Sequence, residues 1–123
     1  MINLTLTEVL EKLNNREISS VELTRAYLDR IEKYGTDLNC YITVTPERAM
    51  ADAAASDARR AAGDTLALDG APIAMKDLFA TRGIRTTAAS RMLENFVPQY
   101  ESTVTQNLLN DGATPSKYKS LIS

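Results

Sequence analysis

Apolar residues recur at spacings of three and four along the first third of the chain, and this spacing predicts amphipathic helices. The clearest case begins at Ser19, after which Val21, Leu28 and Ile31, with Thr24 between them, fall on one face of a helix while the opposite face carries charged residues. A glycine commonly ends a helix because it adopts the left-handed conformation without strain, and Gly35 is placed to do so. We therefore expect a helix that packs through one face and ends at Gly35.

Two hydroxyl residues near the N-terminus are each followed three positions later by a glutamate. Thr5 precedes Glu8, and Ser19 precedes Glu22. At this spacing the hydroxyl accepts a hydrogen bond from the glutamate's main-chain N–H, while the glutamate carboxylate accepts one from the N–H of the capping residue. The pattern predicts two successive helices, which begin just after Thr5 and just after Ser19.

Residues 49–62 are rich in alanine and predict a third helix, whose small side chains would let it pack close to a neighbour. Thr45 is placed to cap this helix, and Pro46 suits its first position because the missing N–H is not needed there. Gly63 can end it.

The second half of the chain has the signals of a strand, a loop and a helix. Residues 72–76 predict a strand that begins with a proline, and the β-branched and aromatic residues 41–44 predict a further short strand or extended segment. Ser102 is placed to cap a last helix that ends at residues 111–112. The side chains expected to point inward from this helix are Val104, Leu108 and Leu109.

This order of elements indicates an α/β fold: N-terminal helices followed by the first part of an α/β/α sandwich, with an incomplete sheet. The next element should be a buried parallel strand, typically a run of valine, isoleucine or leucine. Residues 114–120 instead contain a proline, two lysines and two serines. We therefore predict that residues 1–113 form part of one domain and that residues 114–123 form a divergent, disordered tail.

Composition narrows the class of protein. A length of 123 residues fits one domain, and the net charge of -2 provides no broad basic surface for nucleic acid. No apolar run approaches the ~20 residues that span a bilayer, and no signal peptide begins the chain, so we expect a cytoplasmic protein. Cys40 is the only cysteine, which excludes an intramolecular disulfide and predicts an inert, partly buried thiol.

The chain contains no histidine, which excludes Ser-His-Asp triads, Cys-His dyads and most zinc sites. Lys76 is then the strongest candidate for a base, because it closes an apolar strand and the ends of strands in α/β sheets are where sites form. Alternation places Pro72 and Ala74 on its side of the strand, where small apolar neighbours would dehydrate the amine and favour its neutral, basic form. The alternative is a solvated lysine that pairs loosely with Asp77.

Residues 70–78, Gly-Ala-Pro-Ile-Ala-Met-Lys-Asp-Leu, resemble the G-[IV]-P-[IV]-A-[IVL]-K-D signature of the amidase-signature family, with Ala71 as the one departure. The resemblance runs almost continuously from the first helix to Ala113. Within the family, the A subunits of glutamyl-tRNA(Gln) amidotransferases are the most similar, through residues 17–24, 38–44, 86–98 and 100–104.

This resemblance implies a Ser-Ser-Lys triad in which Lys76 is the catalytic base. In such enzymes the lysine draws a proton through a middle serine from a nucleophilic serine, which here would attack the amide of glutamine. The ammonia would pass to a B subunit, which uses ATP and Mg to activate the glutamyl end of a tRNA. The implied partners are subunits B and C, glutamine and Glu-tRNA(Gln), with Asp-tRNA(Asn) as an alternative acceptor. We expect no cofactor or metal on this chain itself, and no membrane partner.

Neither serine of the implied triad can be assigned in this chain. The family places both serines in glycine- and serine-rich stretches beyond the position of Ala113. None of the serines that follow Ala113, and neither of the two that precede it most closely, lies in a glycine-rich stretch. The serines excluded in this way are Ser90, Ser102, Ser116, Ser120 and Ser123. We therefore expect the N-terminal portion of an amidotransferase A subunit, inactive by itself. The alternatives are a non-catalytic partner-binding fragment and a general amide hydrolase of the same family.

Overall fold

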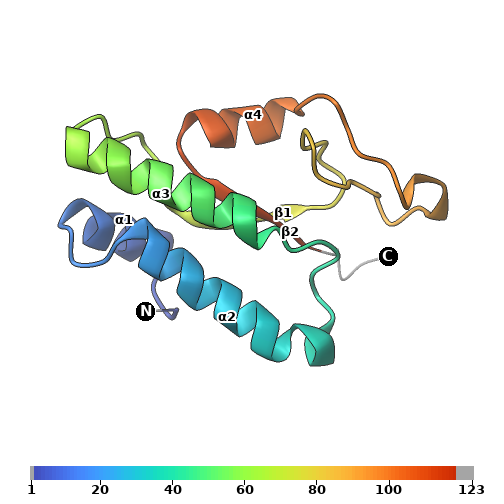
Figure 1. Cartoon of the computed structure of the whole chain (residues 1–123), viewed down its shortest axis with the longest axis horizontal. Helices are drawn as coiled ribbons and strands as arrows, with labels where there is room; N and C mark the ends of the chain where they lie inside the picture. The colour runs from blue at the N-terminus through green and yellow to red at the C-terminus, as the bar shows by residue number, and fades with distance from the viewer. Residues whose placement is uncertain (1, 119–123) are drawn as a thin grey trace.

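The structure is a computed structural model that describes residues 2–118, with the backbone alone at residues 115–118. Three helices come first, followed by a strand, a long loop, a helix and a second strand (Figure 1). The elements are α1 (Leu6–Asn14), α2 (Ser20–Leu38), α3 (Pro46–Ala62), β1 (Pro72–Lys76), the 3-10 helix η1 (Arg91–Leu93), α4 (Thr103–Asn110) and β2 (Thr114–Tyr118).

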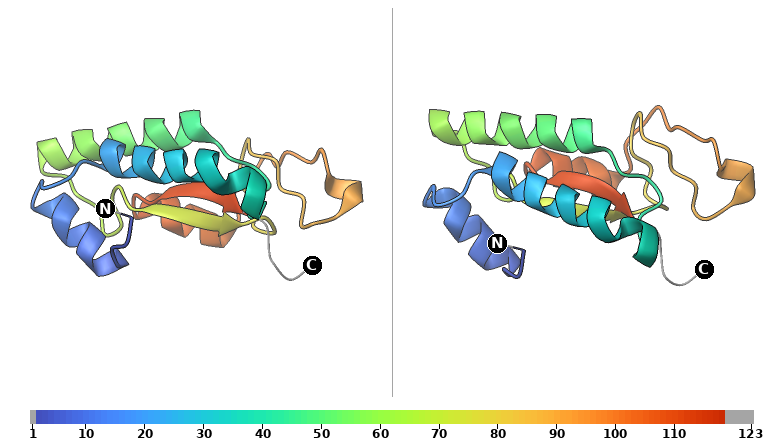
Figure 2. Two further views of the ribbon diagram at one scale, coloured as in Figure 1. Left: turned by 90° about the horizontal axis from the view of Figure 1, so that it is seen from below. Right: turned by 60° about the horizontal axis from the view of Figure 1, so that its bottom comes forward.

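The two strands form a parallel pair between layers of helices. Their register runs from Pro72 opposite Thr114 to Lys76 opposite Tyr118. Helices α2 and α3 lie together on one side of the sheet and α4 lies on the other (Figure 2). Because α4 connects two parallel strands, β1, α4 and β2 form a βαβ unit. The arrangement confirms the predicted α/β class.

The helix starts follow the local sequence signals. The Thr5 hydroxyl accepts from the Glu8 N–H at 3.2 Å while the Glu8 carboxylate accepts from the Thr5 N–H at 2.7 Å. Ser19 and Glu22 make the same reciprocal pair at 3.0 and 3.1 Å. Both predicted capping boxes are therefore confirmed.

The alanine-rich helix α3 is bounded as the sequence predicts. It begins at Pro46 after the N-cap Thr45, whose side chain makes no capping hydrogen bond, and Gly63 ends it with a φ of 85°. Its buried face includes Ala49 and Ala53. These small side chains allow α3 to lie directly against α2.

The apolar core described by the structure joins α1 to α2. Val9, Leu13 and Leu23 are buried there, with Leu4, Ile18 and Tyr27 packed around them. On the predicted face of α2, Thr24 is buried, whereas Val21, Leu28 and Ile31 are only partly buried. The predicted face is therefore confirmed at Thr24 and elsewhere lies at the edge of the packed surface.

Three local predictions are wrong in whole or in part. Helix α2 passes through Gly35, because a glycine inside a helix costs only about 1 kcal/mol, and it ends at the left-handed residue Asn39, with φ 48°. Residues 41–44 form no strand with any described residue, which leaves the alternative of an extended segment. In α4 the inward direction is wrong for Val104, which is 43% exposed, whereas Leu108 and Leu109 are partly buried and Thr105 is buried.

Strand β2 contradicts the prediction of a disordered tail for residues 114–118. Parallel pairing uses main-chain groups, and strand preference depends on the partner more than on intrinsic propensity. The N–H of Thr114 donates to the carbonyl of Ala71 at 2.9 Å, and the N–H of Gly70 donates to the carbonyl of Gly112 at 3.0 Å. The rest of the predicted tail, residues 119–123, lies outside the described residues, and the division of the chain at residue 113 stays a prediction.

Cys40 is a free, partly buried thiol, as expected. Over residues 2–118, no helix has the length and apolar character needed to cross a membrane.

Candidate active site

Lys76 lies at the carboxyl end of β1, where the loop of residues 77–102 begins and projects beyond the two strands (Figure 2). Along β1 the Met75 side chain is buried at 4% exposure, whereas Ala74 is exposed and Pro72 and Lys76 are partly buried. The lysine therefore lies on the more open side of the strand. Among the described residues, Pro72 and Ala74 therefore shield the Lys76 amine from water only in part.

Asp77, the next residue, is buried at 3% exposure and turns toward the loop. Both of its carboxylate oxygens accept from the Thr87 N–H at 3.2 Å, and one accepts a short hydrogen bond from the Thr87 hydroxyl. Its main-chain carbonyl accepts from the Ala88 N–H at 2.9 Å. The loose pairing of Lys76 with Asp77 is not found among the described residues, because the carboxylate is buried and bound to Thr87. Whether Lys76 acts as a base or is a solvated lysine stays open at this point.

The loop segment of residues 86–90 closes on itself beside Asp77. Ala88 and Ala89 have left-handed φ angles of 49° and 59°. The Ala89 N–H donates to the Thr87 hydroxyl oxygen at 3.2 Å, and the Ser90 N–H donates to the Thr87 carbonyl at 2.8 Å. Thr87 thus organises the segment from both its side chain and its main chain.

A cavity of about 270 Å³ lies against this loop segment and is lined by Thr87, Ala89 and Ser90. Arg85, which also lines it, donates to the Glu94 carbonyl at 3.1 Å and so joins the two arms of the loop. Lys76 does not line this cavity, which is connected to the end of β1 only through Thr87 and its hydrogen bond to Asp77.

The turn that leads into β1 is held by an ion pair in which the carboxylate of Asp69 is buried and the Arg59 side chain is partly exposed. Arg59 on α3 donates to both oxygens of Asp69, at 2.6 and 3.0 Å, and the Leu66 N–H donates to the same carboxylate at 3.1 Å. Burial favours the neutral acid, but the hydrogen bonds from Arg59 and Leu66 outweigh it and hold the pKa of Asp69 below its usual value. A charged Asp69 therefore ties the turn before β1 to α3.

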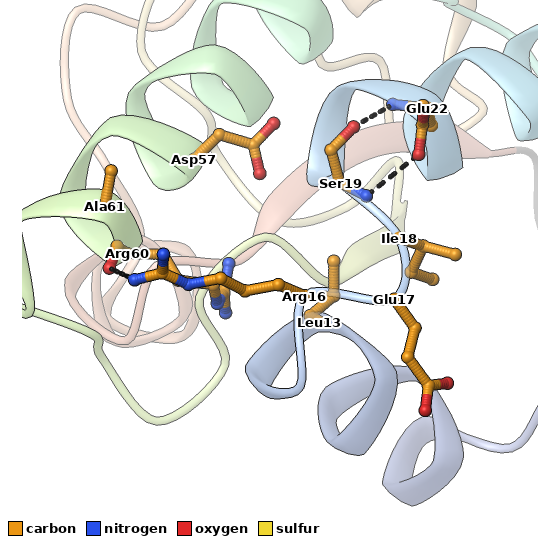
Figure 3. A pocket seen from close by; sticks show the side chains of 9 residues that line it. All are labelled: Leu13, Arg16, Glu17, Ile18, Ser19, Glu22, Asp57, Arg60 and Ala61. Carbon is orange, nitrogen blue, oxygen red and sulfur yellow. Dashed lines mark hydrogen bonds between the residues drawn. The ribbon is translucent and has the colours of Figure 1, made fainter.

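A larger cavity, of about 400 Å³, lies at the opposite end of the fold, between α1, α2 and α3 (Figure 3). Arg16 reaches across it and donates to the Arg60 carbonyl at 3.4 Å. Asp57 also lines it and accepts from the N–H groups of Ser20 and Val21, at the start of α2. Lys76 does not line this cavity, so it is separate from the candidate site.

Two of the serines that the sequence analysis excluded from the triad have described side chains, and both lie at the start of a helix. Ser102 caps α4, with its hydroxyl oxygen accepting from the Thr105 N–H at 3.1 Å. Ser90 precedes η1 as its N-cap. The side chains of Ser116, Ser120 and Ser123 lie outside the described part of the chain.

Sequence reasoning identified Lys76 but missed Asp77 and Thr87 as a pair. The Lys-Asp dipeptide and the Thr-Thr pair at residues 86–87 are visible in the sequence. Their contact spans ten residues of loop and depends on two left-handed alanines, which no local pattern predicts.

Comparison with known proteins gives consistent matches. The family model described as Amidase matches residues 22–116. The chain is 55% identical over 113 residues to the A subunit of the glutamyl-tRNA(Gln) amidotransferase of Sinorhizobium fredii, and 56% identical over 113 residues to that of Caulobacter vibrioides. Each match covers 92% of this chain and 23% of the relative, so the chain spans about a quarter of the length of these relatives.

Solved structures share the fold. A peptide amidase from Stenotrophomonas maltophilia matches with a TM-score of 0.88 at 26% identity, covering 94% of this chain and 24% of that one. A bacterial aryl acylamidase of the amidase signature family matches with a TM-score of 0.86 at 26% identity, covering 95% of this chain and 25% of that one. In both cases the likeness extends over nearly all of this chain.

Proposed function

Since the chain belongs to the amidase family, we propose that it is the N-terminal part of a glutamine-hydrolysing subunit of a tRNA-dependent amidotransferase, with Lys76 as its catalytic base. The observation behind this proposal is the position of Lys76, which ends a parallel strand within a segment more than half identical to amidotransferase A subunits.

The geometry of Lys76 suits a base that serves a site completed by other residues. The lysine is partly buried on the open side of β1, at the carboxyl end of the strand pair. Ligands of α/β sheets bind beyond the carboxyl ends of the strands. Further chain that packs over Ala74 and Lys76 would remove water from the amine and favour its neutral form.

The proposed reaction splits the amide of glutamine in two steps. Neutral Lys76 takes a proton, through a middle serine, from a nucleophilic serine whose oxygen bonds to the amide carbon. Collapse of the tetrahedral intermediate breaks the carbon–nitrogen bond, and the protonated lysine returns the proton to the departing ammonia. Water then hydrolyses the glutamyl ester, releasing glutamate. Both serines belong to sequence that would complete the enzyme.

The proposed partners follow from the same assignment. The ammonia would pass to a B subunit that binds ATP and Mg, with a C subunit in the complex, and Glu-tRNA(Gln) or Asp-tRNA(Asn) would accept it. An intracellular site of translation fits these partners. The cofactors belong to the partner subunit, and we assign none to this chain.

Sequence identity favours an amidotransferase over a general amide hydrolase. The relatives named as amidotransferase subunits are 51 to 56% identical to this chain, while the peptide amidase and the aryl acylamidase are each 26% identical. Fold similarity to the hydrolases therefore reflects the shared family, and the preferred substrate is glutamine.

The proposal is tested in a chimeric subunit, in which this chain replaces the matching quarter of the Sinorhizobium fredii protein, produced with that organism's other amidotransferase subunits. Ammonia release from glutamine is measured for Lys76→Ala and Lys76→Arg. Loss of a positioned base lowers kcat by about 10³-fold. Arginine cannot replace the lysine because it does not deprotonate in proteins.

The matched control is Lys33→Ala, which removes a lysine from the exposed face of α2. Its kcat should stay within about twofold of the unsubstituted chimera, as expected for a surface change. A chimera that assembles but releases no ammonia, or a Lys76→Ala variant as active as the Lys33→Ala control, would contradict the proposed function.

A further inference from the structure

Asp77 is joined to Thr87 by an unusually complete set of hydrogen bonds. The carboxylate accepts from both the N–H and the hydroxyl of Thr87, and both residues are buried, at 3% and 5% exposure. The Asp77 carbonyl also accepts from the N–H of Ala88 at 2.9 Å. Side chain and main chain of Asp77 therefore hold the same short segment of the loop.

The charge of Asp77 explains why these bonds are strong. A buried carboxylate is costly unless it is paired or well hydrogen-bonded. None of the ion pairs among the described residues includes Asp77. Its stabilisation comes from Thr87, and hydrogen bonds to an ionised acceptor are about twice as strong as those between neutral groups.

The segment that Asp77 holds has a conformation that alanine seldom adopts. Ala88 and Ala89 are both left-handed, a conformation that places Cβ too close to the main chain. Such residues persist only where the surrounding contacts over-determine them, and they gather at functional sites. Here those contacts are the bonds from Ala88 to Asp77 and from Ala89 to the Thr87 hydroxyl oxygen.

The same contacts constrain Lys76. Among the described residues, the last pair of β1 and β2 is Lys76 opposite Tyr118, and the loop begins directly after Lys76. The Lys76 carbonyl accepts from the Phe79 N–H at 3.1 Å, and the Asp77 carboxylate anchors the next residue. Lys76 is thus the first residue of a tight turn, and Asp77 follows it directly inside that turn. Anchoring Asp77 therefore fixes the main chain from which the Lys76 side chain leaves.

We propose that Asp77 and Thr87 are positioning residues, which hold Lys76 in the direction required for proton transfer. This inference rests on the proposed role of Lys76 as the base. Neither residue exchanges a proton with the substrate. A displacement of about 1 Å in a catalytic group can cost on the order of 100-fold in rate.

The test uses the chimeric subunit with three substitutions. Asp77→Asn keeps the size of the side chain but removes its charge, and Thr87→Val keeps the branched shape but removes the hydroxyl. Thr87→Ser keeps the hydroxyl. We expect kcat for ammonia release to fall about 10- to 100-fold in Asp77→Asn and Thr87→Val, with KM for glutamine within about threefold, because the base is misdirected while substrate contacts remain. Thr87→Ser should keep kcat within about threefold.

Asp69→Asn is the control for a purely structural acid. Asp69 is also buried and hydrogen-bonded, but its partner is Arg59 and it lies at the opposite end of β1 from Lys76. This variant should lower the melting temperature and leave kcat at 25 °C within about twofold. The inference is overturned if Asp77→Asn changes only the melting temperature, as Asp69→Asn does, or if Thr87→Ser lowers kcat as far as Thr87→Val.

The outcomes also separate this inference from the proposed function. If Lys76→Ala keeps its activity, the proposed function fails. If Lys76→Ala is inactive while Asp77→Asn and Thr87→Val keep an unchanged kcat, only the positioning role fails. Should Asp77→Asn not fold, the comparison of Thr87→Val with Thr87→Ser still decides, because the first replaces only the hydroxyl with a methyl group and the second removes only the methyl group.

Discussion

Replacing Gly70 with alanine should destabilise the protein more than the same change at Gly63, a left-handed glycine with open space around it. Gly70 precedes β1 with a φ of 83°, and an added Cβ would lie 2.7 Å from the Ser56 hydroxyl oxygen and 2.8 Å from the Ser20 Cβ. Ser20 belongs to α2 and Ser56 to α3, and the Ser20 hydroxyl donates to the Gly70 carbonyl at 2.8 Å. The methyl group would therefore separate both helices from the start of the strand.

The cost has two parts. A left-handed φ costs an L-residue about 1–2 kcal/mol, and forcing an extra methyl group into a packed site costs a further ~1–3 kcal/mol. Gly63→Ala isolates the first part, since Gly63 has a φ of 85° and no atom lies within 4 Å of the added Cβ. Gly70→Ala should therefore exceed Gly63→Ala by about 1–3 kcal/mol in free energy of unfolding.

The assay is urea denaturation of the chain, followed by circular dichroism at 222 nm for the unsubstituted protein and both variants. With a slope of about 1–3 kcal/mol per molar urea, the Gly70→Ala midpoint should fall roughly 1 M below that of Gly63→Ala. Equal midpoints for the two variants would refute the close approach of α2 and α3 to Gly70.

Three further predictions concern charge, capping and activity. The hydrogen-bonded Asp69 has a lowered pKa, so the stability that its charge contributes is complete above the pKa of the unfolded chain, about 3.9, and is lost as pH falls through the lower pKa of the folded protein. Acid unfolding should therefore be less steep in Asp69→Asn, and a pH profile identical to that of the unsubstituted protein would argue against a charged Asp69. Ser19→Ala removes the oxygen that accepts from the Glu22 N–H and should cost about 1 kcal/mol in urea denaturation, whereas no loss would mean that the cap is not formed in solution. The purified chain alone should release no ammonia from glutamine because neither triad serine is assigned in it, and release that Lys76→Ala abolishes would show that reasoning to be wrong.

The sequence predicted the elements whose determinants are local. A capping box joins residues three positions apart, so Ser19 and Glu22 specify the start of α2 without reference to the rest of the fold. The bounds of α3 follow in the same way from Pro46 and Gly63. Lys76 was identified because it closes an apolar strand, at the end where sites form in α/β sheets, and because residues 70–78 resemble a known signature.

The features that sequence reasoning missed depend on contacts between distant residues. Strand β2 contains a proline at the position opposite Ile73, and its polar sequence forms a strand only because β1 lies beside it. The bond between Asp77 and Thr87 requires a closed loop and the left-handed Ala88 and Ala89. A pattern within a short stretch of sequence therefore does not predict this hydrogen bond.

The role of Lys76 as the base is tested most directly by chemical rescue of the chimeric Lys76→Ala subunit with methylamine. We predict negligible ammonia release from glutamine without the amine. Glutamate formation should then recover in proportion to the concentration of neutral methylamine, because a small amine can occupy the space left by the side chain and accept the proton. Glutamate formation by Lys76→Ala at the unsubstituted rate, with no dependence on methylamine, would contradict the assignment of Lys76 as the base.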